Sequence, residues 1–157
     1  MLCGLLQEKV SIQDISTVFE SIADFGDKEH NIDLIIENVR KSIGRVICLP
    51  YISDEKILKV IGLSYELETM IEINAKETEL GKIIKPNFYK TLINLIIDAL
   101  EKIENEKIKP IFLCSTLNRK LLYEAIKNIN PEIIVLSSFE VPKAIVVQYS
   151  LVLEAFK

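Results

Sequence analysis

The residues best suited to chemistry are a cysteine and an arginine near the end of a predicted strand. Cys114 closes the apolar run Ile111–Cys114, where a strand gives way to the first turn of a helix. Such a position activates a thiol and binds phosphate, as in cysteine-dependent phosphatases. Those enzymes separate the cysteine from an arginine by five residues, whereas Arg119 follows Cys114 after only four, none of them glycine. A small phosphatase-like enzyme using Cys114 and Arg119 stays an alternative; the favoured interpretation of Cys114 is a buried strand end.

The other side chains form no catalytic, cofactor-binding or metal-binding pattern. His30 is the only histidine and lies in the charged segment Asp27–His30, which leaves little for a triad or a multi-histidine metal site. The glycines are isolated, and neither GxGxxG nor a phosphate-binding loop occurs. We therefore predict no enzyme, no catalytic residue, no cofactor and no metal site.

Composition places the chain among globular proteins. It has 157 residues, 49% of them hydrophobic and 27% charged, which is enough for a core without disulfides. The net charge of -4 comes from interleaved signs, so the basic footprint of a nucleic-acid binder is missing. Three widely spaced cysteines in apolar surroundings, Cys3, Cys48 and Cys114, predict buried free thiols in a reducing compartment. The sequence has no apolar run that would span a bilayer and no signal-peptide pattern, so we expect a soluble cytosolic fold.

A helical subdomain is predicted over residues 1–49. Helical spacing of apolar residues and the capping pattern at Ser11 indicate helices, and Gly44 suits the position just past a helix end. The expected elements are a helix over Leu2–Glu8, a helix capped by Ser11 and ending at Phe25, a helix over Ile32–Ile43, and an extended run over Val46–Leu49.

An α/β subdomain is predicted over residues 50–157. Its clearest part is a strand–helix–strand unit between Ile108 and Pro142, because parallel strands require such a crossover. The expected elements are strands at 57–63, 111–114, 133–136 and 144–153, a short helix through Leu67 and Ile71, a long helix at 88–104, a helix after Thr116, and a loop at 72–85. The predicted fold class is α+β, in which the helical subdomain precedes a small mixed sheet containing a βαβ unit.

Two motifs in the first part carry a family resemblance. Residues 5–23 read LLxExVSIxDxxTxxExxA, and residues 39–45 read VRxxxGR. Together with Val60–Leu63, Pro110–Ser115 and Val135–Ser137, these motifs resemble the C-terminal cytoplasmic region of the FlhA/LcrD family. Members of that family are export-gate proteins of flagellar and virulence type III secretion systems. Gln13 departs from the family's usual arginine, and residues 72–86 match no family pattern.

The resemblance implies a docking and assembly role. Relatives form a nine-membered ring beneath a membrane gate, so expected partners are further gate subunits, export chaperone–substrate complexes and machinery proteins, with no nucleic acid. The expected location is the cytoplasmic face of the bacterial inner membrane, with membrane contact only through an N-terminal part that this sequence lacks. Gly44-Arg45 favours a flagellar system.

Residues 1–49 resemble the subdomain implicated in ring contacts. Charged groups at a ring seam fix register and orientation, which makes the charged and polar side chains of the two motifs and their helices candidates for inter-subunit contacts. The candidates are Gln13, Asp14, Glu37, Arg40 and Arg45. The alternative is that these residues are helix caps and solvated charges.

Overall fold

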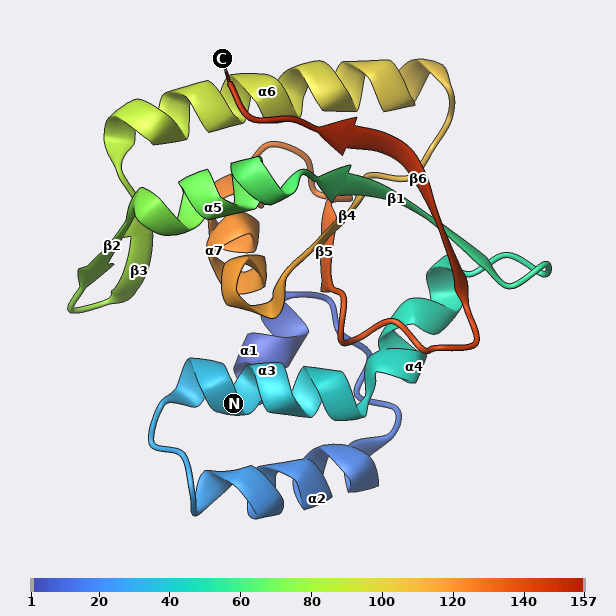
Figure 1. The fold of residues 1–157 in the computed structure, drawn as a ribbon. Coiled ribbons are helices and arrows are strands. Elements are labelled where there is room, and N and C mark those ends of the chain that lie inside the picture. The colour runs from blue at the N-terminus through green and yellow to red at the C-terminus, as the bar shows by residue number, and fades with distance from the viewer. Residues whose placement is uncertain (1, 157) are drawn as a thin grey trace. The chain divides into compact units, whose positions relative to one another are not determined.

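The computed structural model describes residues 2–156, and the chain forms two compact units (Figure 1). The first unit contains the chain up to Leu58 together with Phe139–Val146, a segment that we call the strap. The second unit contains Lys59–Ser138 and the chain from Val147 onward. Compactness does not test independent folding, so the predicted division between residues 49 and 50 stays a prediction.

The first unit is built from helices. Its elements are α1 (Leu2–Gln7), α2 (Ile15–Gly26), α3 (Ile32–Ser42), α4 (Gly44–Cys48) and the 3-10 turn η1 (Leu49–Tyr51). Helices α2 and α3 pack against each other as a hairpin, as their short connection predicts (Figure 1).

The cap of α2 is Asp14, three residues later than predicted. The Asp14 carboxylate accepts from the backbone N–H of Thr17 at 3.2 Å and from its hydroxyl at 2.7 Å. Ser11 accepts only a long bond of 3.4 Å from the backbone N–H of Gln13. A carboxylate also suits the positive end of the helix dipole, which explains why Asp14 begins the helix and Ser11 does not.

The chain after α3 was predicted only in part. Gly44 lies just past the end of α3, as predicted, because α3 ends at Ser42 and Ile43 is its C-cap; the same glycine then begins α4. The run predicted as extended, Val46–Leu49, is helical because Ile47 and Cys48 then both face the interior of the first unit. An apolar run this short does not distinguish a buried strand from a buried helical turn.

A small sheet forms the second unit. Its strands are β1 (Ile57–Leu63), β4 (Ile111–Cys114), β5 (Ile134–Ser137) and β6 (Val146–Leu153), in the order β5-β4-β1-β6 (Figure 1). Strand β4 pairs in parallel with β1 and with β5, as the predicted crossover requires. The first residues of β1 and β6 belong to the first unit, and both strands continue into the second.

Helices and a hairpin complete this unit. They are α5 (Tyr65–Ile73), β2 (Ala75–Thr78), β3 (Gly81–Ile84), α6 (Pro86–Asn105) and α7 (Thr116–Ile126). Residues 72–85 were predicted as a loop, but the end of α5 and the antiparallel hairpin β2–β3 occupy them. The hairpin's residues are mostly exposed, so it lacks the apolar alternation that marks a strand in a sequence. The antiparallel pairing thus lies in this hairpin, and the predicted α+β class is confirmed.

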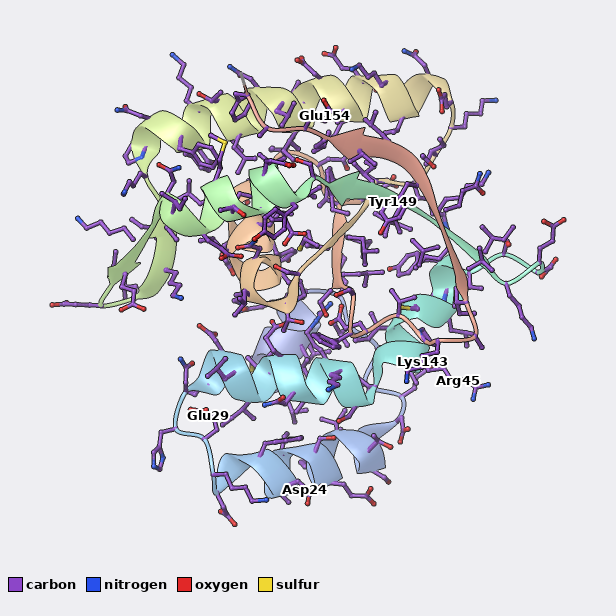
Figure 2. All side chains as sticks on the ribbon, viewed as in Figure 1. Asp24, Glu29, Arg45, Lys143, Tyr149 and Glu154 are labelled. Carbon is purple, nitrogen blue, oxygen red and sulfur yellow. The ribbon has the colours of Figure 1, made fainter. Side chains whose placement is uncertain are left out.

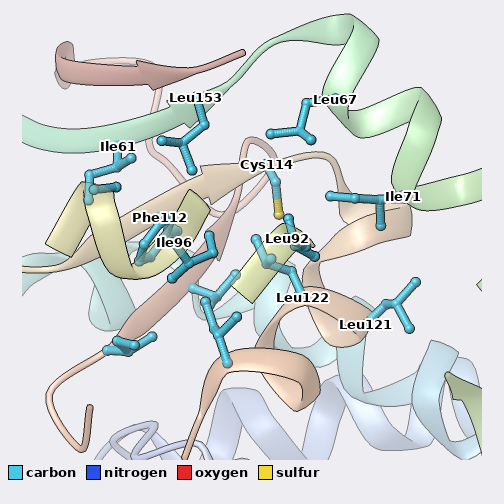
Figure 3. Close-up of a cluster of buried hydrophobic side chains, with 14 of the residues drawn as sticks. Ile61, Leu67, Ile71, Leu92, Ile96, Phe112, Cys114, Leu121, Leu122 and Leu153 are labelled. Carbon is cyan, nitrogen blue, oxygen red and sulfur yellow. The ribbon is translucent and has the colours of Figure 1, made fainter. Parts of the chain in front are cut away.

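The core of the second unit lies between the sheet and its helices. Side chains of β1, α5, α6, β4 and α7 interlock there, and Figure 3 shows Leu92 and Ile96 of α6 beside Phe112 of β4. Phe88 of α6 also packs edge-on against Phe156, with ring centroids 6.0 Å apart. This continuous apolar cluster fixes the second unit without disulfides.

Candidate functional site

The five predicted contact residues lie on or beside three helices of the first unit. Gln13 and Asp14 are exposed at the start of α2, Glu37 is half-buried on α3, and Arg45 is exposed on α4. Figure 2 shows Arg45 pointing outward. Arg40, on α3, differs from the others because it is 2% exposed. Asp14 serves as a helix cap, as the alternative interpretation expected, while a role of the five in subunit contacts stays a prediction.

Arg40 is the centre of a buried charge cluster, which consists of Glu8, Arg40 and Glu140 and which we call the Arg40 cluster. Arg40 Nη1 lies 2.9 Å from Oε2 of Glu8. Arg40 Nε donates to Oε1 of Glu140, and a second bond joins Nη2 to Oε2 of Glu140 at 3.4 Å. The side chains are 2% (Arg40), 3% (Glu8) and 1% (Glu140) exposed. One guanidinium therefore faces two buried carboxylates from distant parts of the sequence.

Three residues along one side of α3 and α4 contact Glu140. Arg40, Gly44 and Cys48 are four residues apart, so they lie along one side of the consecutive helices. A Cβ atom on Gly44 would lie 2.2 Å from the carbonyl oxygen of Glu140. The Cys48 thiol donates to that same oxygen, with Sγ at 3.5 Å. We call these three residues the Glu140 seat, and glycine is required at its centre by this close approach.

Burial and the charges of the Arg40 cluster shift the pKa values of two nearby groups, the Cys48 thiol and the Tyr51 hydroxyl. Burial, reinforced by the Glu140 carboxylate, raises the pKa of the Cys48 thiol to about 12, and the Arg40 charge opposes this rise. Burial likewise raises the pKa of Tyr51. Cys48 therefore stays protonated at neutral pH and acts as a donor to the strap.

The raised pKa of Cys48 predicts an alkaline loss of stability. The folded state holds the thiol proton more tightly than the unfolded state, so the full contribution is present below pH 9 and is lost as the pH rises toward 12. The slope is at most about 1.4 kcal/mol per pH unit. Urea unfolding of the wild type should show this loss relative to Cys48→Ala, and the exposed-thiol control Cys3→Ala should follow the wild type. Parallel curves for wild type and Cys48→Ala would contradict it.

Sequence reasoning missed Glu8 and Glu140 as partners of Arg40. Glu8 belongs to a recognised motif, but nothing local indicates that it is buried. Glu140 lies 100 residues from Arg40, so no spacing rule connects the two. A single sequence carries no signal for that pairing.

The alternative chemical site, Cys114 and Arg119, lies inside the second unit. Cys114 is 3% exposed, and Figure 3 shows its sulfur among the apolar side chains of Leu67, Leu92 and Leu122. Arg119 is 0% exposed. The favoured interpretation, a buried strand end, is confirmed for Cys114.

A carboxylate already occupies the N-terminus of α7. The backbone N–H of Ser115 donates to both carboxylate oxygens of Glu68, at 3.2 and 3.1 Å. Asn118 adds a bond from its amide nitrogen to Glu68 Oε2 at 3.2 Å. This is the place where a phosphatase would hold its phosphate, and a fixed negative charge there repels one. The geometry therefore disfavours phosphatase chemistry at Cys114.

The first unit also exposes large apolar side chains on its helices. Phe19 of α2 is 55% exposed, and Ile32 and Leu34 of α3 are 59% and 46% exposed. Ile15 lies one turn before Phe19 on α2 and is exposed as well. Ile15 and Phe19 are four residues apart, so they leave exposed apolar surface on one face of α2.

Other predicted features can also be placed. His30 is exposed in the loop between α2 and α3, as expected of a solvated residue. Within residues 2–156, no three His, Cys, Asp or Glu side chains form a group that could hold a metal ion. None of the helices in that range has the length and apolar character needed to cross a membrane.

Comparison with known sequences finds one family over most of the chain. The model of the FHIPEP family matches residues 1–146. The flagellar biosynthesis protein FlhA of Borreliella burgdorferi is 33% identical over 147 residues, which are 92% of this chain and 21% of that protein. The chain thus spans about a fifth of the length of this curated relative.

Comparison with solved structures finds the same fold in secretion proteins. A nonameric SctV-C assembly from EPEC, solved by cryo-EM, matches with a TM-score of 0.82 and 26% identity, over 98% of this chain and 45% of that one. The Chlamydia pneumoniae CdsV protein, solved in a complex with CdsO, matches with a TM-score of 0.78 and 27% identity, over 94% of this chain and 44% of that one.

Proposed function

Because the chain belongs to the FHIPEP family, as its two N-terminal motifs predicted, we propose that it forms part of the cytoplasmic portion of a protein export gate. Its role there is to help assemble a ring of identical subunits and to dock export machinery, chaperones and substrates. The observation that carries this proposal is the match of 98% of the chain to a relative solved as a nonamer. The 33% identity to a flagellar protein favours a flagellar gate at the inner membrane.

The exposed helix face of the first unit is the proposed ring seam. A neighbouring copy that covers Phe19 and Ile15 of α2 removes apolar surface from water, which favours assembly. Gln13 and Asp14, exposed just before Ile15, and Arg45, exposed on α4, supply polar groups that set register. Glu37 and Arg40 stay predicted contacts, although Arg40 now has its own carboxylates within the subunit.

Docking of machinery proteins is supported by a relative. The matched CdsV protein was solved in complex with CdsO, and the match covers 94% of this chain. The second unit lies within the matched part, so we assign machinery docking to its exposed surface. This role requires no catalytic residue, cofactor or metal.

Phe19→Asp tests the proposed seam. We expect assembly of the full-length gene product to weaken at least about tenfold, because each seam would bury an uncompensated carboxylate. Subunit stability should change by no more than about 0.5 kcal/mol, since Phe19 is 55% exposed. The measurements are ring population by mass photometry and secreted filament protein in culture medium.

Leu117→Asp is the matched control for this test. Leu117 is 76% exposed on α7 of the second unit, so the same substitution there should leave the ring intact. If Phe19→Asp still assembles fully into rings, this face of α2 does not form the contact between subunits. Intact rings with normal export after both substitutions would count against the seam but not against membership of the gate.

A further inference from the structure

We propose that Glu140 is the releasable anchor of the strap, so that the Glu140 seat is a latch between a held and a free state of residues 139–145. The inference concerns the first unit alone and does not depend on ring assembly. It is carried by the geometry of the Arg40 cluster, by the burial along the strap and by the covalent course of the chain.

Glu140 is the strap's principal anchor. It is 2% exposed and is held by Arg40 through its carboxylate and by Cys48 through its carbonyl oxygen. The flanking Phe139 is 65% exposed, with the Lys41 ammonium 5.0 Å from its ring centroid. Lys143 points outward (Figure 2), and Ala144 beside it is also exposed. Val141, Pro142 and Ile145 are half-buried, and the backbone N–H of Val146 donates to the carbonyl oxygen of Lys56 at 2.9 Å. Glu140 is thus the one fully buried residue of the strap, and the part of the strap before Val146 opens when this side chain leaves.

Release of Glu140 from Arg40 should cost less than breaking an isolated buried ion pair, because Arg40 has a second carboxylate partner. Removing one member of a buried pair normally leaves an uncompensated charge, which is strongly unfavourable. Arg40, however, also faces Glu8 at 2.9 Å. When Glu140 leaves, the guanidinium and the Glu8 carboxylate remain as a one-to-one pair. Both states of the latch therefore keep Arg40 paired, which is the requirement for a two-state element.

The strap connects β5 to β6, so its release changes the segment between these two strands. Residues on both sides of it, Ser138 and Val147, belong to the second unit. While the strap is held, its eight residues are part of the first unit. Once Glu140 has left, residues 139–145 become a flexible tether of up to about 3.4 Å per residue before β6, whose first residue Val146 keeps its bond to Lys56.

The three cysteines provide a test without added labels. Cys3 is exposed, so the prediction of a buried thiol was wrong for it, whereas Cys48, bonded to Glu140, and Cys114, in the second unit, are buried as predicted. We would treat the full-length gene product with iodoacetamide under native conditions and quantify the three cysteine peptides by mass spectrometry. Cys3 reports reagent activity, Cys48 reports strap release, and Cys114 reports unfolding of the second unit.

Two isosteric substitutions give opposite expectations. Glu140→Gln removes the anchoring charge, so Cys48 labelling should accelerate about ten- to a hundredfold while Cys114 labelling is unchanged. Because losing the Glu140 charge also lowers the pKa of Cys48, the rates are compared across a pH series, in which strap release gives an acceleration that persists after correction for the thiolate fraction. Glu8→Gln removes the carboxylate that competes for Arg40, so Cys48 labelling should slow at least about threefold. Equal acceleration by both substitutions would show a merely structural cluster and overturn the latch. So would parallel rises at Cys48 and Cys114, or a Cys48 rate that Glu140→Gln leaves unchanged.

Discussion

Arg40→Ala is expected to lower the free energy of unfolding of the first unit by about 3–5 kcal/mol, because it leaves two buried carboxylates facing each other without their guanidinium. Urea unfolding followed by circular dichroism measures this loss. Arg45→Ala is the matched control, since Arg45 is exposed on the neighbouring helix and its loss should change stability by no more than about 0.5 kcal/mol.

A further variant separates charge from packing. Replacing the whole cluster, as Glu8→Leu, Arg40→Met and Glu140→Leu together, removes every buried charge and should recover most of the stability that Arg40→Ala loses. A single substitution at Arg40 that leaves stability unchanged would show that the cluster contributes little. The same argument explains why charge reversal at Arg40 cannot test the ring seam: it changes the subunit before it changes any contact.

Gly44→Ala is expected to lower the free energy of unfolding by about 3 kcal/mol or more, nearly as much as Arg40→Ala. The added Cβ would lie 2.2 Å from the Glu140 carbonyl oxygen and 2.9 Å from two further backbone atoms of that residue. Because these are backbone atoms, no side-chain rotation relieves the overlap, and either α4 or the strap must move. Thermal or urea unfolding measures the loss, and iodoacetamide should then also reach Cys48 faster.

Gly26→Ala is the control for this substitution. A Cβ at Gly26, the last residue of α2, meets nothing within 4 Å, so alanine there should be neutral or stabilise by up to about 1 kcal/mol. Gly62→Ala should cost an intermediate amount of stability, because its Cβ would lie 2.6 Å from the exposed ring of Tyr149, a side chain that can move, and in ordinary contact with Val152 at 3.7 Å. Equal losses at Gly44 and Gly26 would mean that helix propensity, and not the Glu140 seat, explains Gly44.

Local signals predicted most of this fold because most elements carry their own pattern. The 20 residues of α6 have regular apolar spacing, and β4 is a wholly apolar run followed by α7, whose buried apolar residues recur at helical spacing. The hairpin β2–β3 and the helix α4 lack such patterns. In α4 the decisive interaction is with the strap, so the reason for its conformation lies far away in the sequence.

The same distinction applies to the candidate site. Asp14 and Arg45 could be placed on the surface from their local sequence, and the structure exposes both. Arg40 has the same kind of neighbours in the sequence, yet it is buried, because Glu140 reaches it across 100 residues. Local composition predicts that an arginine is charged, but only the tertiary fold determines where that charge is neutralised.

The discontinuity of the first unit has a consequence for synthesis on the ribosome. Residues up to 58 are translated first. The strap that completes their unit is translated much later, after strand β5 of the second unit and just before the rest of β6. At elongation rates of about 5 to 20 residues per second, the delay between Leu58 and the end of the strap lasts about 4 to 18 s. Until the strap is translated, Arg40, Gly44 and Cys48 lack their partner Glu140. The β4–α7–β5 crossover, by contrast, is already complete when the strap is translated. The N-terminal unit is therefore expected to finish folding only after the strap has emerged, although it is synthesised first.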